Sequence, residues 1–126
     1  MHRSRIAGLI IDCKTDDLDS AARFWGRALG YEPKYSSNPK DQGYILLQTP
    51  SDEPHIELQK VTHASRVHID IETDDVEAEV SRLEALGAKR CQKVRDWWVM
   101  EAPTGHRFCV IGTDSLLSES KTNKWE

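Results

Sequence analysis

The feature that most constrains this chain is a stretch that occurs twice. Residues 9–30 form an apolar run, a Thr-Asp-Asp step and an amphipathic segment ending in Ala-Leu-Gly, and residues 66–87 repeat that order. The runs and the Thr-Asp-Asp steps match at an offset of 58 residues, whereas the segment ends match at 57, so one residue was gained or lost inside the segment. A weak internal duplication of this kind predicts two copies of one structural unit.

The first copy reads as one strand, one helix and three strands. Residues 6–13 are an isoleucine-rich run typical of a buried strand. One of residues 15–17 can cap the helix that follows, and Gly30 is suited to a left-handed helix end. After a loop with one short strand at residues 33–35, we expect two strands joined by a hairpin at residues 44–48 and 55–61.

The second copy repeats this order after a polar joint at residues 62–65. We expect a strand at residues 67–72 and a helix that ends at Gly87, because apolar residues recur at helical spacing between them. Three further strands are predicted, at residues 89–94, 97–101 and 107–112. The polar tail, residues 115–126, is ordered only if it docks, and its Leu116, Leu117 and Trp125 leave docking open.

The order β-α-β-β-β, written twice, predicts an α+β fold. We expect one domain over residues 1–114, with module one at about 4–62, module two at about 66–113, and the tail outside it. Two such modules predict a curved mixed sheet with the helices outside and a cleft enclosed between the modules. A cleft of this kind is a natural place for a ligand.

Composition excludes several classes of function. Apolar residues make up 38% and charged residues 30%, as in an ordinary globular protein. The net charge of −4 provides no basic surface for nucleic acid, and no apolar run approaches membrane-spanning length. The three cysteines lack metal-finger or disulfide spacing, and the N-terminus lacks the features of a signal peptide. We therefore expect a cytoplasmic protein that binds neither nucleic acid nor membrane.

Three segments carry a resemblance to a known family: DDLDSAARFWGRALGYEP, VHIDIETDDVEAEVSRLEALGAKR and WWVMEAPTGHRFCVIG. Together with the paired βαβββ order they resemble the vicinal oxygen chelate superfamily, which includes glyoxalase I, ring-cleaving dioxygenases and bleomycin-binding proteins. The chain is most similar to the small glyoxalase-like domain proteins, over roughly residues 4–113. The resemblance implies the fold and a homodimer, but the superfamily uses one scaffold for many chemistries.

The resemblance also implies four metal-ligand positions facing the cleft. They fall at Ile10, Glu57, His68 and Cys109 in this sequence. Ile10 cannot ligate, and enzymes of the superfamily usually have glutamate where Cys109 stands. Glu57, His68 and Cys109 could hold Zn²⁺ with a water, whereas Mg²⁺ and Mn²⁺ favour sites without a thiol.

Each candidate residue has a functional and a structural interpretation. Glu57 is a general base in the cleft or a solvent-facing residue of an edge strand, and His68 is a ligand, acid or base, or a histidine of the core. Cys109 is a metal ligand or a buried, inert thiol. Asp70 lies where Asp12 lies in the first copy, so it contacts the ligand or shares a structural role with Asp12.

Two tryptophans extend the predicted ligand site. Trp97 and Trp98 are adjacent in one strand and therefore point to opposite faces, so one of them can form a wall of the cleft. Ile10 is a further candidate ligand contact, because its position faces the cleft in the family that the chain resembles.

Two functions follow from these residues. The first is binding of a small, partly apolar molecule in the cleft without the standard four-ligand metal site. The second is a lyase or isomerase, in which Glu57 removes a proton next to a carbonyl and His68 stabilises the enolate oxygen, with or without a metal.

Overall fold

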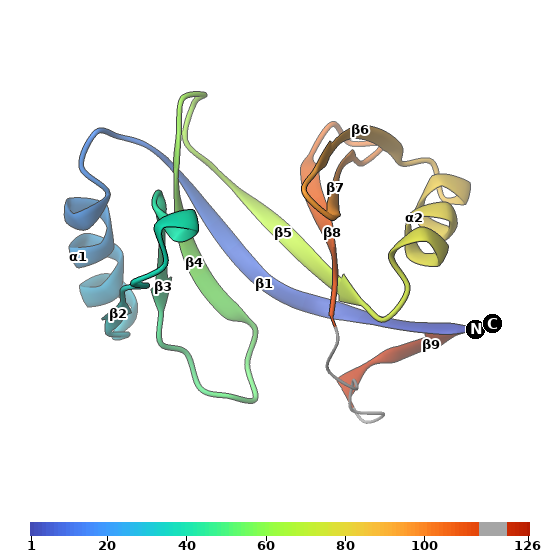
Figure 1. Cartoon of the computed structure of the whole chain (residues 1–126), viewed down its shortest axis with the longest axis horizontal. Helices are drawn as coiled ribbons and strands as arrows, with labels where there is room; N and C mark the ends of the chain where they lie inside the picture. Colours follow the sequence, from blue (N-terminus) through green and yellow to red (C-terminus); the bar gives the residue numbers. More distant parts are fainter. Residues whose placement is uncertain (114–120) are drawn as a thin grey trace. The chain divides into compact units, whose positions relative to one another are not determined.

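The computed structural model of the chain describes residues 1–113 and 121–126. It divides into two compact units, and each is described by itself (Figure 1). The α1 unit comprises residues 8–68, and the α2 unit comprises residues 1–7 together with residues 69–126. The boundary therefore passes through two strands, β1 (His2–Lys14) and β5 (Arg66–Thr73).

The α1 unit contains the first βαβββ set. After β1 come α1 (Leu18–Leu29), β2 (Pro33–Lys34), a short 3-10 helix η1 (Pro39–Asp41), β3 (Tyr44–Leu47) and β4 (His55–Val61). The strand order is β2-β3-β4-β1, in which β1 and β4 run parallel and the other neighbours run antiparallel. The predicted order of the first module is confirmed.

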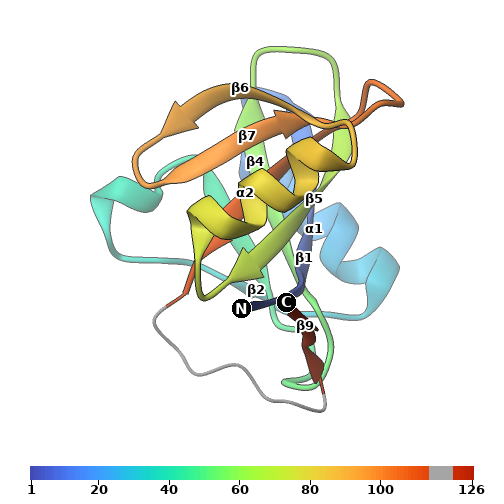
Figure 2. The same ribbon diagram turned by 90° about the vertical axis from the view of Figure 1, so that its right-hand side faces the viewer.

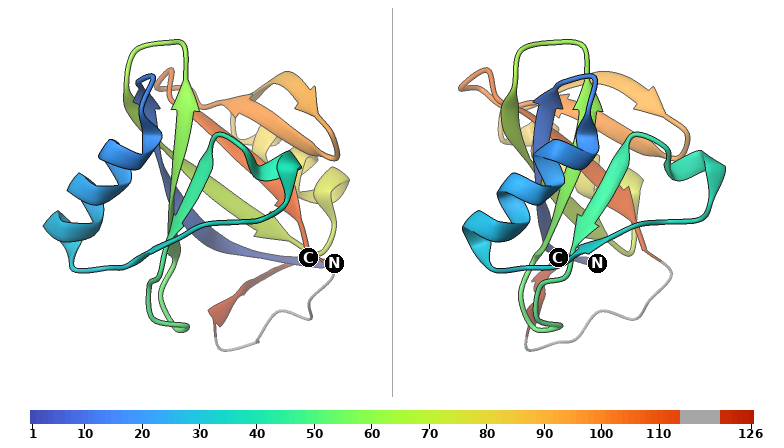
Figure 3. Two further views of the ribbon diagram at one scale, coloured as in Figure 1. Left: turned by 60° about the vertical axis from the view of Figure 1, so that its left-hand side comes forward. Right: turned by 90° about the vertical axis from the view of Figure 1, so that its left-hand side faces the viewer.

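Local chemistry fixes the ends of α1. The Asp17 side chain accepts a hydrogen bond from the backbone N–H of Ser20, so it caps the first turn. Gly30 ends the helix with φ 81°, a left-handed conformation that glycine adopts without a steric penalty. The inner face of α1 packs against strands β1, β3 and β4 (Figure 3), and the buried core consists of Cys13, Ala22, Ile45, Leu47 and Leu58.

The α2 unit contains the second set and an additional strand. Its elements are β5, α2 (Val76–Ala85), β6 (Lys89–Val94), β7 (Trp97–Glu101), β8 (Arg107–Gly112) and β9 (Asn123–Trp125). Strands β5 and β8 run parallel, and β8-β7-β6 form an antiparallel meander. The three predicted strands after the helix have the expected bounds.

The helix of the α2 unit covers one face of its strands (Figure 2). Asp75 caps it by accepting a hydrogen bond from the backbone N–H of Ala78, as Asp17 caps α1. Its buried side chains Val80 and Leu83 meet Met100 of β7 and Val110 of β8. Together with the first set, this arrangement confirms the predicted α+β class with two βαβββ modules.

The first strand starts earlier than the sequence predicted. It begins at His2 rather than at residue 6, because His2 and Ser4 are buried and pair with the C-terminal strand β9. The polar residues at positions 2–5 gave no apolar signal, so the prediction was wrong about this end. Part of the tail therefore docks, whereas Leu116 and Leu117 lie outside the described residues.

A buried ionic network joins β1, α2 and β9. The His2 imidazole donates to Glu79 over 2.7 Å, and Arg82 donates to both Glu79 oxygens at 2.9 and 2.8 Å. The Arg82 guanidinium lies 3.7 Å from the ring centroid of Trp125, whose Nε1 donates to the Ser4 hydroxyl. This network anchors the end of the chain to its beginning.

The hydrogen bonds in this network decide the protonation of Glu79. Burial raises the pKa of Glu79, but the hydrogen bonds from Arg82 and His2 outweigh it and hold the pKa below its ordinary value. The hydrogen bond between Arg82 and Glu79 also raises the pKa of Arg82. Glu79 is therefore a buried, ionised group whose charge depends on its partners.

One close backbone approach restricts β1. Gly8 lies opposite His55 in the β1–β4 ladder. A Cβ at Gly8 would lie 2.5 Å from the His55 carbonyl oxygen and 2.7 Å from its Cδ2 and Nε2 atoms. Only glycine allows the His55 ring and backbone to lie this close to β1.

Among the residues that the structure describes, neither helix has the length and apolar character needed to cross a membrane.

We predict that Glu79→Gln lowers the free energy of unfolding by about 2–3 kcal/mol near neutral pH, because it leaves Arg82 without its charged partner. The pKa of Glu79 is lower in the folded protein than in the unfolded chain, so its charge stabilises the fold fully at a pH above the unfolded-state pKa. This stabilisation is lost as the pH falls through the folded-state pKa. The difference between wild type and Glu79→Gln in urea denaturation should therefore shrink below about pH 4.

Glu77→Gln is the matched control, because Glu77 lies on the same helix and pairs with Arg90 at the surface. It should unfold close to wild type. Equal losses in the two variants would contradict the buried role of Glu79.

We predict that Gly8→Ala destabilises the protein by about 1–3 kcal/mol, because the methyl group overlaps the His55 backbone, which cannot rotate away. Gly112→Ala is the control, since its Cβ would meet only one Val76 methyl group, at 3.1 Å. Thermal unfolding of both variants measures the difference. A melting temperature for Gly8→Ala equal to that of Gly112→Ala would refute the close approach.

Candidate functional site

A hollow of about 620 Å³ lies over strands β3 and β4 of the α1 unit. We call it the β3–β4 pocket. Its lining includes Lys34, Tyr35, Asp41, Tyr44, His55 and Glu57. The pocket thus combines two aromatic rings with cationic, anionic and imidazole groups in one place.

The alternation of the strands explains how the pocket arises. In β3, Ile45 and Leu47 face the helix core, so Tyr44 and Leu46 point to the other face. In β4, Leu58 faces the core, so Glu57 points to the same side as Tyr44. Period-two alternation therefore separates an apolar helix face from a polar pocket face.

Glu57 has a neighbour that the sequence interpretation did not include. Its Oε2 atom lies 3.9 Å from Nε2 of His55, and its side chain is 27% exposed. The His55 ring rests on Gly8, which holds it beside the carboxylate. Ile10 lies opposite Glu57 in the β1–β4 ladder and is buried. An acidic group and an imidazole at this separation can exchange a proton through a bound group between them.

His68, near the start of β5, is oriented by a buried carboxylate. Its Nδ1 atom lies 2.8 Å from Oδ2 of Asp12, which is 3% exposed. A carboxylate only accepts, so Nδ1 of His68 carries a proton and donates it to Asp12. Nε of Arg66 lies 3.8 Å from the same Asp12 oxygen.

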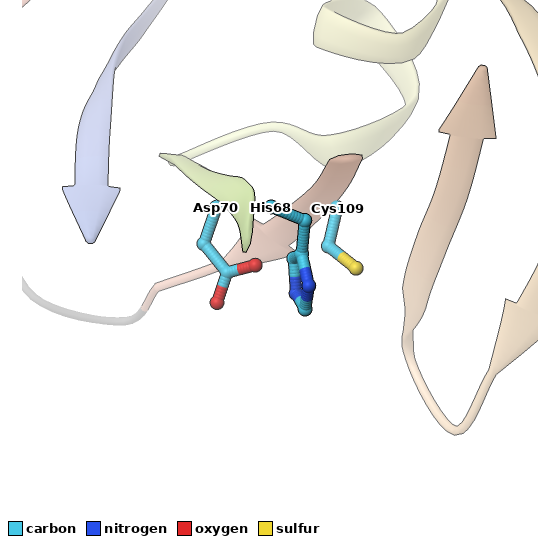
Figure 4. Close-up of side chains that lie close together, drawn as sticks. All are labelled: His68, Asp70 and Cys109. Atoms are coloured by element: carbon cyan, nitrogen blue, oxygen red, sulfur yellow. The ribbon is translucent and has the colours of Figure 1, made fainter. Parts of the chain in front are cut away.

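Figure 4 shows His68, Asp70 and Cys109 projecting together from β5 and β8. One ligand atom of each of these side chains lies within 4.8 Å of the other two. Asp70 stands directly opposite Cys109 in the parallel β5–β8 ladder, and it is buried. The cluster therefore offers imidazole, carboxylate and thiol donors to a cation.

The residues predicted as metal ligands are only partly grouped in this cluster. His68 and Cys109 are together, and the carboxylate beside them is Asp70. Glu57 lines the β3–β4 pocket instead. Since a hard cation such as Mg²⁺ favours oxygen ligands, the thiol and imidazole of this donor set suit Zn²⁺ better.

The two tryptophans lie in different surroundings. Trp98 packs against the α2 core, with the Arg90 guanidinium 5.0 Å from its ring centroid. Trp97 has the Arg95 guanidinium 5.6 Å from its centroid. Neither residue lines the β3–β4 pocket, so their place in a ligand site stays a prediction.

His55, Tyr44, Tyr35 and Lys34 are among the pocket residues that sequence reasoning missed. The sequence did carry a signal for two of them. Tyr44 is two residues from Leu46 and His55 is two residues from Glu57, so each shares a strand face with another residue of the pocket. Lys34 and Tyr35 lie in a short edge strand and the loop that follows it. That segment has no alternating apolar pattern from which the direction of its side chains could be predicted.

Comparison with known proteins supports one family. The sequence model of the glyoxalase-like domain matches residues 8–111. No curated protein sequence matched the chain.

Solved structures share the fold at low sequence identity. Methylmalonyl-CoA epimerase from Mycobacterium tuberculosis is 16% identical with a TM-score of 0.60, and 88% of this chain and 89% of that one are covered. The Streptomyces coelicolor enzyme is 20% identical with a TM-score of 0.60, covering 90% and 97%. A hypothetical protein from Bacillus halodurans is 12% identical with a TM-score of 0.65, covering 92% and 99%.

Because the family match spans most of the chain, and the two βαβββ modules agree with the fold of these neighbours, the resemblance to the vicinal oxygen chelate superfamily is confirmed, and the chain belongs to the glyoxalase-like domain family.

Proposed function

We propose that this protein binds a small, partly apolar molecule in the β3–β4 pocket, with Glu57 as its anchoring acceptor. The observation that carries the proposal is the placement of Glu57 beside His55 in a hollow flanked by Tyr35 and Tyr44. A pocket that combines aromatic surface with a few polar groups is typical of small-molecule sites.

The lining describes the ligand. The rings of Tyr35 and Tyr44 and the side chain of Leu46 suit a flat or branched apolar portion. Glu57 accepts hydrogen bonds, so the ligand carries a donor group such as a hydroxyl, amide or amine. Lys34 suits a carbonyl or carboxylate of the ligand. The homodimer implied by the family resemblance stays a prediction.

We predict that ligands found by saturation-transfer NMR in a fragment library lose about tenfold or more in affinity for Glu57→Gln, because a hydrogen bond to a charged group contributes about 1.5–3 kcal/mol. Titration calorimetry measures the loss. Glu53→Gln is the matched control, since Glu53 is exposed near the turn before β4. Ligands that bind both variants equally would place the binding site outside the pocket.

An isomerase that moves a proton next to a carbonyl is the second candidate. Glu57 would take the proton from the carbon while the electron pair shifts to the carbonyl oxygen, and the proton then returns to the carbon. His55 lies beside Glu57 and would stabilise the oxygen, whereas His68, predicted from the sequence for this role, is not among the residues that line the pocket. Two observations favour it. The Glu57–His55 pair lies in the pocket, and several structural neighbours are methylmalonyl-CoA epimerases, one of them solved in complex with methylmalonyl-CoA.

We predict that an active protein exchanges the α-proton of its substrate for deuterium in D₂O, and that Glu57→Gln slows this exchange by about 10²-fold or more. Proton NMR of methylmalonyl-CoA and of hemithioacetals of α-keto aldehydes measures it. Exchange that persists in Glu57→Gln would remove Glu57 as the base. No exchange with either substrate class would leave binding as the function of the pocket.

A further inference from the structure

We propose that the β3–β4 pocket selects dipolar molecules, which carry an anionic group at one end of an apolar ring or short chain and a cationic group at the other. Lys34 binds the anionic end, and Glu57 binds the cationic end. The inference rests on the proposed function of the pocket and narrows the class of ligand that it takes. Every residue that lines this pocket belongs to the α1 unit.

The register of three strands places the two charged residues in one row. Lys34 of β2 stands opposite Leu46 of β3, and Leu46 stands opposite Glu57 of β4. Side chains of residues that stand opposite each other point to the same face of a sheet, and all three line the pocket. The floor of the pocket therefore leads from a cation, over an apolar side chain, to a carboxylate.

The width of this row keeps the two charges apart. Neighbouring strands are about 4.8 Å apart, so the backbones of Lys34 and Glu57 are separated by roughly 10 Å, with Leu46 between them. Lys34 is exposed and makes no ion pair with any residue that the structure describes. Its ammonium group is therefore available to a ligand, and a molecule with one ring between its charged groups can contact both ends of the row.

The cationic end of the ligand fits between Glu57 and His55. Oε2 of Glu57 lies 3.9 Å from Nε2 of His55, which is beyond hydrogen-bond range. One ammonium nitrogen can lie within about 2.9 Å of both atoms, because it carries three N–H donors and a neutral imidazole has a lone pair to accept one of them. The charge of Glu57 favours an ammonium group over an uncharged hydroxyl group.

The second carboxylate of the pocket is bonded within its own loop. Oδ2 of Asp41 accepts a hydrogen bond from the Ser36 hydroxyl over 2.7 Å. Asp41 therefore holds the loop together, whereas Glu57 is positioned by the β3–β4 ladder. For this reason we assign the cationic end of the ligand to Glu57.

Two tyrosines supply apolar surface beside the row. Tyr44 is two residues from Leu46 on β3 and shares its face, and the Tyr44 hydroxyl accepts a hydrogen bond from Nε2 of Gln59 over 3.1 Å, which orients the ring. Tyr35 follows Lys34 and is 57% exposed, so a bound ring would cover apolar surface that otherwise contacts water. These rings favour an aromatic spacer between the charged ends of the ligand.

The test uses 4-(aminomethyl)benzoate, in which an ammonium and a carboxylate group lie at opposite ends of one ring. Benzylamine and 4-methylbenzoate each lack one of these groups and are the matched control compounds. Titration of the ¹⁵N-labelled protein, followed by its amide NMR spectrum, gives the affinity for each compound and locates the contacts. We expect the wild type to bind 4-(aminomethyl)benzoate about tenfold or more tightly than either control compound, with shifted amides in the pocket.

Two variants separate the two ends of the row. Lys34→Gln should weaken binding of 4-(aminomethyl)benzoate and 4-methylbenzoate about three- to tenfold, and should leave benzylamine unchanged. Glu57→Gln should weaken binding of 4-(aminomethyl)benzoate and benzylamine about tenfold, and should not weaken 4-methylbenzoate.

Lys40→Gln is the charge-matched control, since Lys40 lies in the same loop but is not among the residues that line the pocket. It should bind all three compounds like wild type. The amide spectrum of each variant without ligand also reports whether that variant folds.

Equal affinity of the wild type for the three compounds, or no measurable binding of 4-(aminomethyl)benzoate, would overturn the dipolar selectivity. A Lys34→Gln variant that binds both carboxylates like wild type would overturn it as well. If benzylamine binding still depends on Glu57 in these cases, the proposed function stands and only this inference fails. If Glu57→Gln binds every compound like wild type, or the shifted amides lie outside the pocket, the proposed function fails too.

Discussion

The parallel ladder between the first and last strands of each βαβββ set is the constraint on which the rest of the structure depends. It pairs β1 with β4 and β5 with β8, and it fixes which residues stand opposite each other. Since side chains alternate across a strand, one face of each ladder must be apolar to bury its helix. The opposite face is then available for polar groups, and the β3–β4 pocket and the His68 cluster both use it.

The sequence predicted the elements because each of them has a strong local signal. Asp17 and Asp75 cap the two helices, Gly30 ends the first one, and the three strands after α2 have alternating patterns that agree with the structure. The start of β1 lacked such a signal. His2 and Ser4 are polar, and their burial depends on Trp125, which is far away in the sequence. Pairing of this kind cannot be read from local patterns.

The candidate sites were less predictable than the fold, because a site depends on register. The repeat aligns His68 with Ile10, and Ile10 stands opposite Glu57. In the second ladder Asp70, the repeat counterpart of Asp12, stands opposite Cys109, whereas Asp12 stands opposite Gln59 in the first ladder. Cys109 is thus the counterpart of Gln59 rather than of Glu57. Gln59 and Glu57 are two residues apart and lie on the same strand face, so the alternation of side chains could not show which of them corresponds to Cys109.

The two copies of the repeat present different side chains at their ladders. If the two ladders were equivalent, matching positions in them would carry side chains of the same type. Instead, the first ladder pairs Ile10 with Glu57, and the second pairs Asp70 with Cys109. The first ladder therefore places the Glu57 carboxylate beside His55, which suits hydrogen bonding or proton transfer. The second places the Cys109 thiol opposite the Asp70 carboxylate. Asp12 belongs to the first repeat, yet its carboxylate lies 2.8 Å from Nδ1 of His68, the residue that the second repeat has at the position of Ile10.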